Sequence, residues 1–212
     1  MFVISIAALK RNTAILREVK EAAGCHLVLA LKGFSCWKAF PYLRDDLDGC
    51  CASGLWEGLL ARDYFKKHII TYSPAYDEED ISELCEFTDH LDFNSLSQWF
   101  RFREMVMAHP RFKNGSLLCG LRVNPECSTG ETPIYDPCVA GSRLGITAEQ
   151  LAGADLTGAM LMHTAMAGCV GVAGSASITD VRGSASITRV YDSASITDVR
   201  GDASIKEDKR EK

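Results

Sequence analysis

Short apolar runs alternate with segments of helical spacing along the first 165 residues of the chain. Residues 26–31 form an almost unbroken apolar run, which is typical of a strand buried on both faces of a parallel sheet. Residues 8–23 repeat apolar side chains at helical spacing, which predicts an amphipathic helix ending at Gly24. The same reasoning predicts strands near 2–6, 47–52, 68–72, 91–94, 116–123 and 156–163, and helices near 36–44, 53–61, 77–87, 96–108 and 147–152.

Repeated strand–helix units with short connections predict an α/β fold, either a parallel sheet or a (β/α) barrel. A complete eight-unit barrel takes about 250 residues, and five or six units precede residue 170. We therefore expect an incomplete barrel. Lys32 directly follows the apolar run, at the C-terminal tip of a predicted buried strand, where active sites form in such barrels. A half-buried lysine at that place can act as a nucleophilic amine.

The end of the chain differs in kind, because residues 175–212 repeat every nine residues. The tripeptide Ala-Ser-Ile begins at 176, 185, 194 and 203. Each repeat can form one short strand and a turn, but three repeats and a fragment make a marginal stack. We expect residues 1–170 to form the incomplete barrel domain, and residues 171–212 to be a low-complexity tail that is disordered or loosely structured.

Composition excludes some classes of function. A net charge of −5 gives no electrostatic reason to expect nucleic acid. The nine cysteines form no C-x-x-C motif and no cluster with histidine, so we predict reduced thiols in a cytoplasmic protein and no metal site. Residues 153–174 are long and apolar enough to span a bilayer, but they contain Asp155, His163 and five glycines. A buried strand and turn is the favoured interpretation, and we expect no membrane partner.

Six sequence blocks, in order, resemble the N-terminal half of the carboxynorspermidine (carboxyspermidine) decarboxylases. The blocks are LALKGFSCWKAFPYLRDDLDG (29–49), ASGLWEGLLAR (52–62), YSPAYDEEDI (72–81), FNSLSQWFRF (93–102), GLRVNPE (120–126) and YDPCVAGSRLGIT (135–147). The resemblance covers residues 2–165. It implies the (β/α)8 barrel of fold-type III pyridoxal phosphate enzymes, which include ornithine and diaminopimelate decarboxylases. It also implies decarboxylation of a polyamine precursor to norspermidine or spermidine.

The same resemblance assigns roles to individual residues. Lys32, in Ala-Leu-Lys, is implied as the catalytic lysine that attaches pyridoxal phosphate. Arg122 is implied to lie near this cofactor, and His163 to stack on its ring. Ser53 and Glu57 match an Ala-Ser-x-x-x-Glu pattern in the second strand-to-helix turn, and Ser53 is implied to contact the cofactor.

After about residue 165 the sequence departs from this family. The family's glycine-rich phosphate loop, its acidic partner of the ring nitrogen and its C-terminal β-domain, which joins a head-to-tail homodimer, have no visible counterpart. We therefore expect a truncated or rearranged decarboxylase. Three interpretations remain open: a decarboxylase of polyamine biosynthesis, a non-catalytic barrel that binds pyridoxal phosphate, and an inactive remnant with an open barrel.

Overall fold

The computed structural model describes most of the chain. The side chains and backbone are described for residues 3–126, 136–139, 141–152, 154–157 and 159. Backbone strands alone are described at 160–162, 171–172, 177–181, 186–187, 189–191, 195–199, 204–205 and 208–209.

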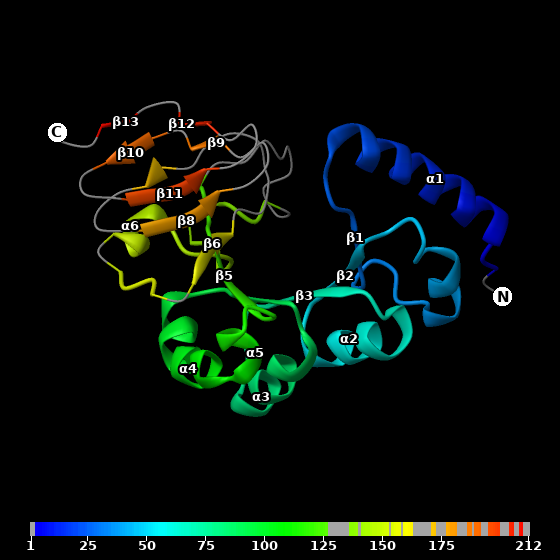
Figure 1. Ribbon diagram of the computed structural model, residues 1–212, viewed down its shortest axis with the longest axis horizontal. Helices are drawn as coiled ribbons and strands as arrows, with labels where there is room; N and C mark the ends of the chain where they lie inside the picture. Colours follow the sequence, from blue (N-terminus) through cyan, green and yellow to red (C-terminus); the bar gives the residue numbers. More distant parts are fainter. Residues whose placement is uncertain are drawn as a thin grey trace.

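The main body is one sheet of six parallel strands in the order β1-β2-β3-β4-β5-β6, so each strand pairs with its neighbours in the sequence. Figure 1 shows these strands as a curved, open arc. Consecutive pairing of parallel strands through outer helices is the arrangement of a (β/α) barrel, here with β1 and β6 at its two edges. The strands are β1 (Val28–Ala30), β2 (Gly49–Ala52), β3 (His68–Ser73), β4 (His90–Phe93), β5 (Leu118–Arg122) and β6 (Met160–Met162).

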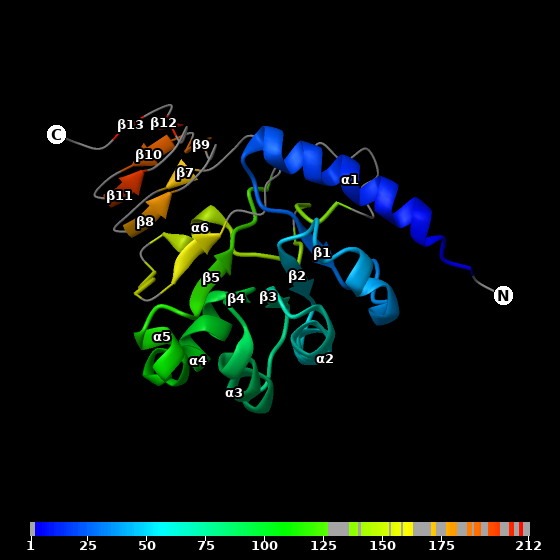
Figure 2. The ribbon, with the colours of Figure 1, turned by 45° about the vertical axis from the view of Figure 1, so that its right-hand side comes forward.

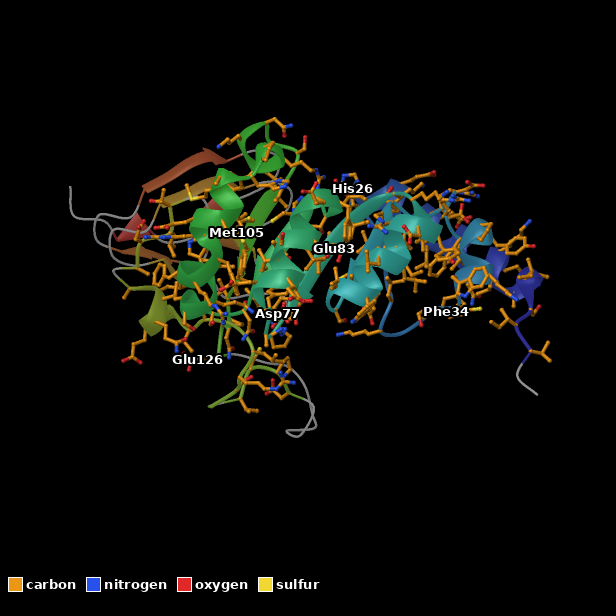
Figure 3. The ribbon with its side chains drawn as sticks, turned by 90° about the horizontal axis from the view of Figure 1, so that it is seen from below. His26, Phe34, Asp77, Glu83, Met105 and Glu126 are labelled. Atoms are coloured by element: carbon orange, nitrogen blue, oxygen red, sulfur yellow. The ribbon has the colours of Figure 1, made fainter. Side chains whose placement is uncertain are left out.

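Helices α2 to α5 cover the convex side of the arc, whereas α1 lies on the opposite side in Figures 1 and 2. Seen from below, α3 and α4 lie side by side, with Glu83 on the former and Met105 on the latter (Figure 3). The helices are α1 (Ile6–Ala23), α2 (Leu55–Leu60), α3 (Glu78–Phe87), α4 (Leu96–Ala108), α5 (Pro110–Lys113) and α6 (Ala148–Leu151), with a 3-10 turn η1 (Trp37–Tyr42) and a π turn η2 (Ala61–Phe65).

Several helix ends follow directly from capping residues. Asp77 begins α3 with a reciprocal capping box to Asp80, and Thr147 begins α6 with one to Gln150. The side chain of Ser95 accepts a hydrogen bond from the Gln98 N–H at the start of α4. These caps satisfy backbone N–H groups that have no partner inside a helix, so they fix where each helix begins.

Alternate residues of β2 to β5 face the helices and form part of the hydrophobic core. Leu91 and Phe93 of β4 and Leu121 of β5 are fully buried in one core cluster with Trp99 of α4. The rings of Phe93 and Trp99 lie 5.3 Å apart. Since strand side chains alternate between the two faces, Asp92 and Arg122 belong to the concave inner face.

Two aspartates hold the starts of alternate strands at the N-terminal edge of the sheet. Asp48 Oδ2 accepts a hydrogen bond of 2.8 Å from the Leu27 N–H, and its other oxygen lies 2.9 Å from Lys20 Nζ. Asp89 Oδ2 accepts an equivalent bond of 2.8 Å from the Ile69 N–H. Asp48 thus joins the start of β2 to the start of β1, and Asp89 joins the start of β4 to the start of β3. The two carboxylates help to fix the register of these strand pairs at the N-terminal edge of the sheet.

Most predicted elements are present, but two expectations at the N-terminal end are wrong. The predicted strand near 2–6 is absent from residues 3–6, because Ser5 caps a helix that begins at Ile6. The run at 26–31 was expected to be a fully buried strand, yet Val28 and Leu29 are only half-buried and Ala30 is exposed. The reason is that β1 is an edge strand, with no neighbour beyond it to cover its free side.

The repeat region contains short strands whose partners are two repeats apart. Ser177 of β8 (Ser177–Val181) lies opposite Ser195 of β11 (Ser195–Val199), in a parallel pair. The parallel pair of β9 (Ser186–Ile187) and β12 (Ser204–Ile205) has the same offset. A third sheet joins β7 (Gly171–Val172), β10 (Arg189–Tyr191) and β13 (Asp208–Lys209). The side chains and turns of this region lie outside the described residues, so the expected disorder of the tail stays a prediction.

No helix in the described part of the chain is both long and apolar enough to cross a membrane.

Candidate functional site

The C-terminal ends of β1 to β5 bring polar side chains together on one edge of the sheet. Ser53 and Asn94 directly follow β2 and β4, and Lys32 comes two residues after the end of β1. Tyr72 is the last residue but one of β3, and Arg122 is the last residue of β5. Because the carboxyl ends of parallel strands meet at one edge, this is the edge where active sites of barrels form. The fold thus places Lys32, Ser53 and Arg122 at the same edge, and their contacts with a cofactor stay predictions.

Lys32 stands at the open side of the arc. The backbone around it is fixed, since the Leu31 N–H donates to the Cys51 carbonyl and the Gly33 N–H donates to the Ala30 carbonyl, both at 3.0 Å. The Lys32 side chain is exposed and makes no hydrogen bond or ion pair within the described residues. The expected half-burial is therefore not observed, because β1 is the edge of the sheet.

The Cys51 thiol of β2 lies close enough to both Lys32 and Asp92 for their charges to change its pKa. Burial raises the pKa of this thiol, and the nearby Asp92 raises it further, whereas the Lys32 cation lowers it. Cys51 faces inward, since Cys50 and Ala52 on either side belong to the core. The Lys32 charge is therefore near enough to the inner face to act on Cys51.

Ser53 and Glu57 lie in the strand-to-helix turn that the sequence pattern predicted, and Glu57 stabilises the backbone of this turn. Glu57 Oε2 accepts a 2.7 Å hydrogen bond from the Ser53 N–H, at the start of α2. Gly54 between them has a φ of 156°, which is unfavourable for other residues. The Ser53 side chain remains exposed at the rim, where it can contact a ligand.

Arg122 lies over the ring of Tyr72, with its guanidinium carbon 5.0 Å from the ring centroid. The Tyr72 hydroxyl donates a 2.6 Å hydrogen bond to Asn94 Oδ1. Burial raises the pKa of Tyr72, although Arg122 and then Arg143 act against this rise. The neutral Tyr72 ring thus holds Arg122 at the C-terminal edge of the sheet by a cation–π contact.

Asn94 connects β4 to the loop before α6. Its Oδ1 also accepts a 2.8 Å hydrogen bond from the Gly145 N–H, and its Nδ2 donates to the Arg143 carbonyl at 2.9 Å. The Ile146 N–H donates to the Arg122 carbonyl at 2.8 Å, which ties the same loop to β5. The loop of residues 142–145 (Ser-Arg-Leu-Gly) is therefore held against the site residues Tyr72 and Arg122.

Asp92 is the most unusual group near this edge. It is 9% exposed, its Oδ1 has no hydrogen-bond partner among the described residues, and burial alone raises the pKa of its carboxyl to about 7. Sequence reasoning missed Tyr72, Asp92 and Asn94. The signal for two of them was available, because Asp92 and Asn94 alternate with the apolar Leu91 and Phe93 and so share the inner face of β4.

His163 lies outside the described residues, so its predicted ring contact stays a prediction. A cavity of about 350 Å³ lies between the β3–α3 loop and the start of α4, and is lined by residues that include Pro74, Tyr76, Ser95 and Arg101. Its lining does not include Lys32, Ser53 or Arg122.

Comparison with known proteins gives the same family from several relatives. No family model matches the chain. A carboxyaminopropylagmatine decarboxylase of Synechocystis is 43% identical over 152 residues, which is 72% of this chain and 38% of that protein. Carboxynorspermidine/carboxyspermidine decarboxylases of Campylobacter jejuni and Herminiimonas arsenicoxydans are 37% and 33% identical, over 76% and 68% of this chain and 40% and 37% of their own lengths.

A solved structure supports this relationship. The crystal structure of carboxynorspermidine decarboxylase from Campylobacter jejuni, complexed with norspermidine, superposes with a TM-score of 0.60 at 32% sequence identity. The match covers 79% of this chain and 38% of the crystallised chain. The chain thus spans about two fifths of the length of the relatives it matches. Over about three quarters of its own length, the chain is homologous to the N-terminal part of the carboxynorspermidine decarboxylases.

Proposed function

We propose that this chain forms the lysine-bearing part of a pyridoxal phosphate-dependent decarboxylase of polyamine biosynthesis. The observation that carries the proposal is the position of Lys32, an exposed amine at the C-terminal end of β1, on the edge that also holds Ser53, Tyr72 and Arg122. The names of the homologous decarboxylases support the reaction class. The cofactor rests on the resemblance of the Ala-Leu-Lys motif to the lysine motif of fold-type III enzymes.

The residues present fit such a cofactor in their chemistry. Lys32 offers a primary amine without a competing ion pair within the described residues, and a primary amine is what an aldehyde group requires. Arg122 offers a half-buried cation, fixed by Tyr72, for an anionic group. Pyridoxal phosphate, when bound, accepts the electron pair that remains when a carboxylate leaves as carbon dioxide.

The protein's own contribution is positioning and charge. The hydrogen-bonded backbone at Leu31 and Gly33 holds Lys32 at the C-terminal end of β1, and the Asn94 contacts keep Tyr72 and the loop before α6 in place. His163 follows β6 directly and is proposed to add a ring contact at the same edge. We keep the division into a barrel segment (1–170) and a repeat tail (171–212) as part of the proposal, together with a homodimer and a cytoplasmic location.

The substrate class is a linear polyamine that carries a carboxylate. One homologue is named for carboxyaminopropylagmatine and two for carboxynorspermidine and carboxyspermidine, and the crystallised relative holds norspermidine. The higher identity to the first homologue, 43% against 37% and 33%, favours carboxyaminopropylagmatine as the first substrate to test. Carboxynorspermidine and carboxyspermidine remain the second candidates.

Carbon dioxide release from each of the three carboxylated amines, measured with the 212-residue chain and added pyridoxal phosphate, tests this function. Release that disappears in Lys32→Ala but persists in Lys38→Ala supports it, because Lys38 is an exposed lysine of η1 whose amine lies over the Trp37 ring. Cofactor binding without release indicates a non-catalytic barrel. The absence of both contradicts the proposal and leaves an inactive remnant.

A further inference from the structure

Two ion pairs and a buried threonine attach one side of α1 to the rest of the chain. Arg17 Nη1 lies 2.7 Å from Asp46 Oδ1, and Lys20 Nζ lies 2.9 Å from Asp48 Oδ1. Thr13 is the residue of α1 that is buried. At 3.6 residues per turn, positions 13, 17 and 20 fall on one side of the helix. The side of α1 that faces the body of the protein is therefore polar.

The opposite side of α1 is apolar and open to solvent. Ile15 and Val19 are 60% and 53% exposed, about half a turn around the helix from Thr13. Helices α2 to α5 lie on the other side of the sheet (Figures 1 and 2). A surface helix ordinarily turns its apolar side toward its own core. In α1 this orientation is reversed, which leaves an apolar helix surface for a partner to cover.

The exposed side of α1 has the spacing of a coiled-coil seam. Its members, which we call the outer stripe, are Ala8, Asn12, Ile15, Val19 and Ala22. These positions are separated by alternating steps of four and three, which is the a/d pattern of a helix that packs against another helix. Leu16, which is 42% exposed, widens the apolar surface on one side of the stripe. The spacing therefore predicts a helix as the partner of α1.

The charges beside the outer stripe indicate which helix this partner is. Arg11 and Glu18 border the stripe on its other side, and neither forms an ion pair with a described residue. Three and four positions away from each of them, α1 has no residue of opposite charge. In an antiparallel pair of α1 helices, Arg11 of each copy lies beside Glu18 of the other. A parallel pair brings like residues to the same level and forms no such ion pair.

We infer that α1 is a dimerisation surface, on which the outer stripes of two copies of this chain pack antiparallel about a two-fold axis. Ala8 of each copy then lies opposite Val19 of the other, and both Asn12 side chains come near the axis. Such a contact is isologous and closed, so it stops at two copies. The stripe spans about 20 Å of helix, so we expect a weak dimer with a small interface. The inference gives a surface to the homodimer of the proposed function, but it depends on neither the cofactor nor the reaction.

Sedimentation equilibrium of the 212-residue chain at low ionic strength, over a range of micromolar concentrations, measures the dimerisation constant. Arg11→Glu and Glu18→Arg each bring like charges together, and each should weaken dimerisation about tenfold. The double variant, with both charges exchanged, should dimerise as the parent does. Because both residues are exposed, these variants are expected to fold. Glu104→Arg, at an exposed position of α4, is the matched control and should leave the constant unchanged.

Three results would overturn the inference. The first is a chain that stays monomeric at every concentration. The second is a dimer that the single charge reversals leave unchanged or that the double variant does not restore, because its contact then lies outside α1. The third is a monomer that binds the separately expressed part of the Campylobacter jejuni decarboxylase that this chain does not match, since the rest of a barrel then covers α1. A dimer that releases no carbon dioxide contradicts the proposed function alone.

Discussion

The Asp92→Asn substitution should change how the stability of this chain depends on pH. Burial raises the pKa of the Asp92 carboxyl from an ordinary 3.8 to about 7, and no described residue forms a hydrogen bond with its Oδ1. At 1.36 kcal/mol per pKa unit, this rise corresponds to about 4 kcal/mol between the protonated and the ionised folded protein. This free energy is the upper limit for the pH-dependent change in stability that Asp92→Asn can remove.

The sign of the effect follows from proton binding. The folded chain holds the Asp92 proton more tightly than the unfolded chain does, so this group contributes its full stability below about pH 4. The contribution is lost as pH rises through the folded pKa of about 7. About 2–3 kcal/mol of the loss falls between pH 5 and pH 8. Because asparagine does not ionise, the unfolding free energy of the Asp92→Asn protein does not contain this pH-dependent contribution.

Urea unfolding, followed by tryptophan fluorescence at pH 5, 6, 7 and 8, measures the difference directly. We expect the free energy of unfolding of Asp92→Asn, relative to the parent, to rise by about 2–3 kcal/mol from pH 5 to pH 8. Comparing the two proteins cancels the titration of other groups, such as His90, whose pKa is lowered mainly by burial. The exposed Asp45→Asn serves as control, and its difference should stay constant. A constant difference for Asp92→Asn as well would refute this account of the buried carboxyl.

Three other substitutions test the fold. Asp48→Asn removes the carboxylate that binds the Leu27 N–H and Lys20, and should cost about 1–3 kcal/mol of unfolding free energy at pH 7. The bonds to Lys20 and Leu27 lower the pKa of Asp48 in the folded chain against the effect of burial, so this loss of stability should shrink below about pH 4. A loss that grew below this pH would contradict the account. Gly145→Ala should cost more than Gly115→Ala, since both have positive φ but only the former meets backbone within 4 Å; equal melting temperatures would contradict this. Trp99→Ala should cost about 3–5 kcal/mol in urea unfolding, because Trp99 is fully buried against Phe93, and a cost below about 1 kcal/mol would place the core elsewhere.

Local signals in the sequence predicted much of the fold. The start of α4 at Ser95 and the end of α1 at Gly24 follow from capping chemistry that involves only neighbouring residues. The exposure of β1 could not be predicted in the same way. An apolar run indicates a buried strand, but whether a further strand covers its free edge depends on the whole sheet.

The candidate site divides along a similar line. Lys32 and Arg122 were found because each ends an apolar strand within a motif of the related family. Tyr72 and Asn94 were missed, because their contact joins two strands and becomes visible only once the register of β3 and β4 is known. Asp92 was missed for a physical reason as well, since an aspartate in a strand is ordinarily exposed and this one is buried without a partner.

The attachment of the cofactor to Lys32 is the central claim of this account. Incubating the 212-residue chain with pyridoxal phosphate, reducing with borohydride and mapping the modified peptides by mass spectrometry tests it most directly. The account predicts one dominant adduct, on Lys32, that is absent from Lys32→Ala. An adduct on another lysine, or scattered modification that Lys32→Ala leaves unchanged, would contradict it.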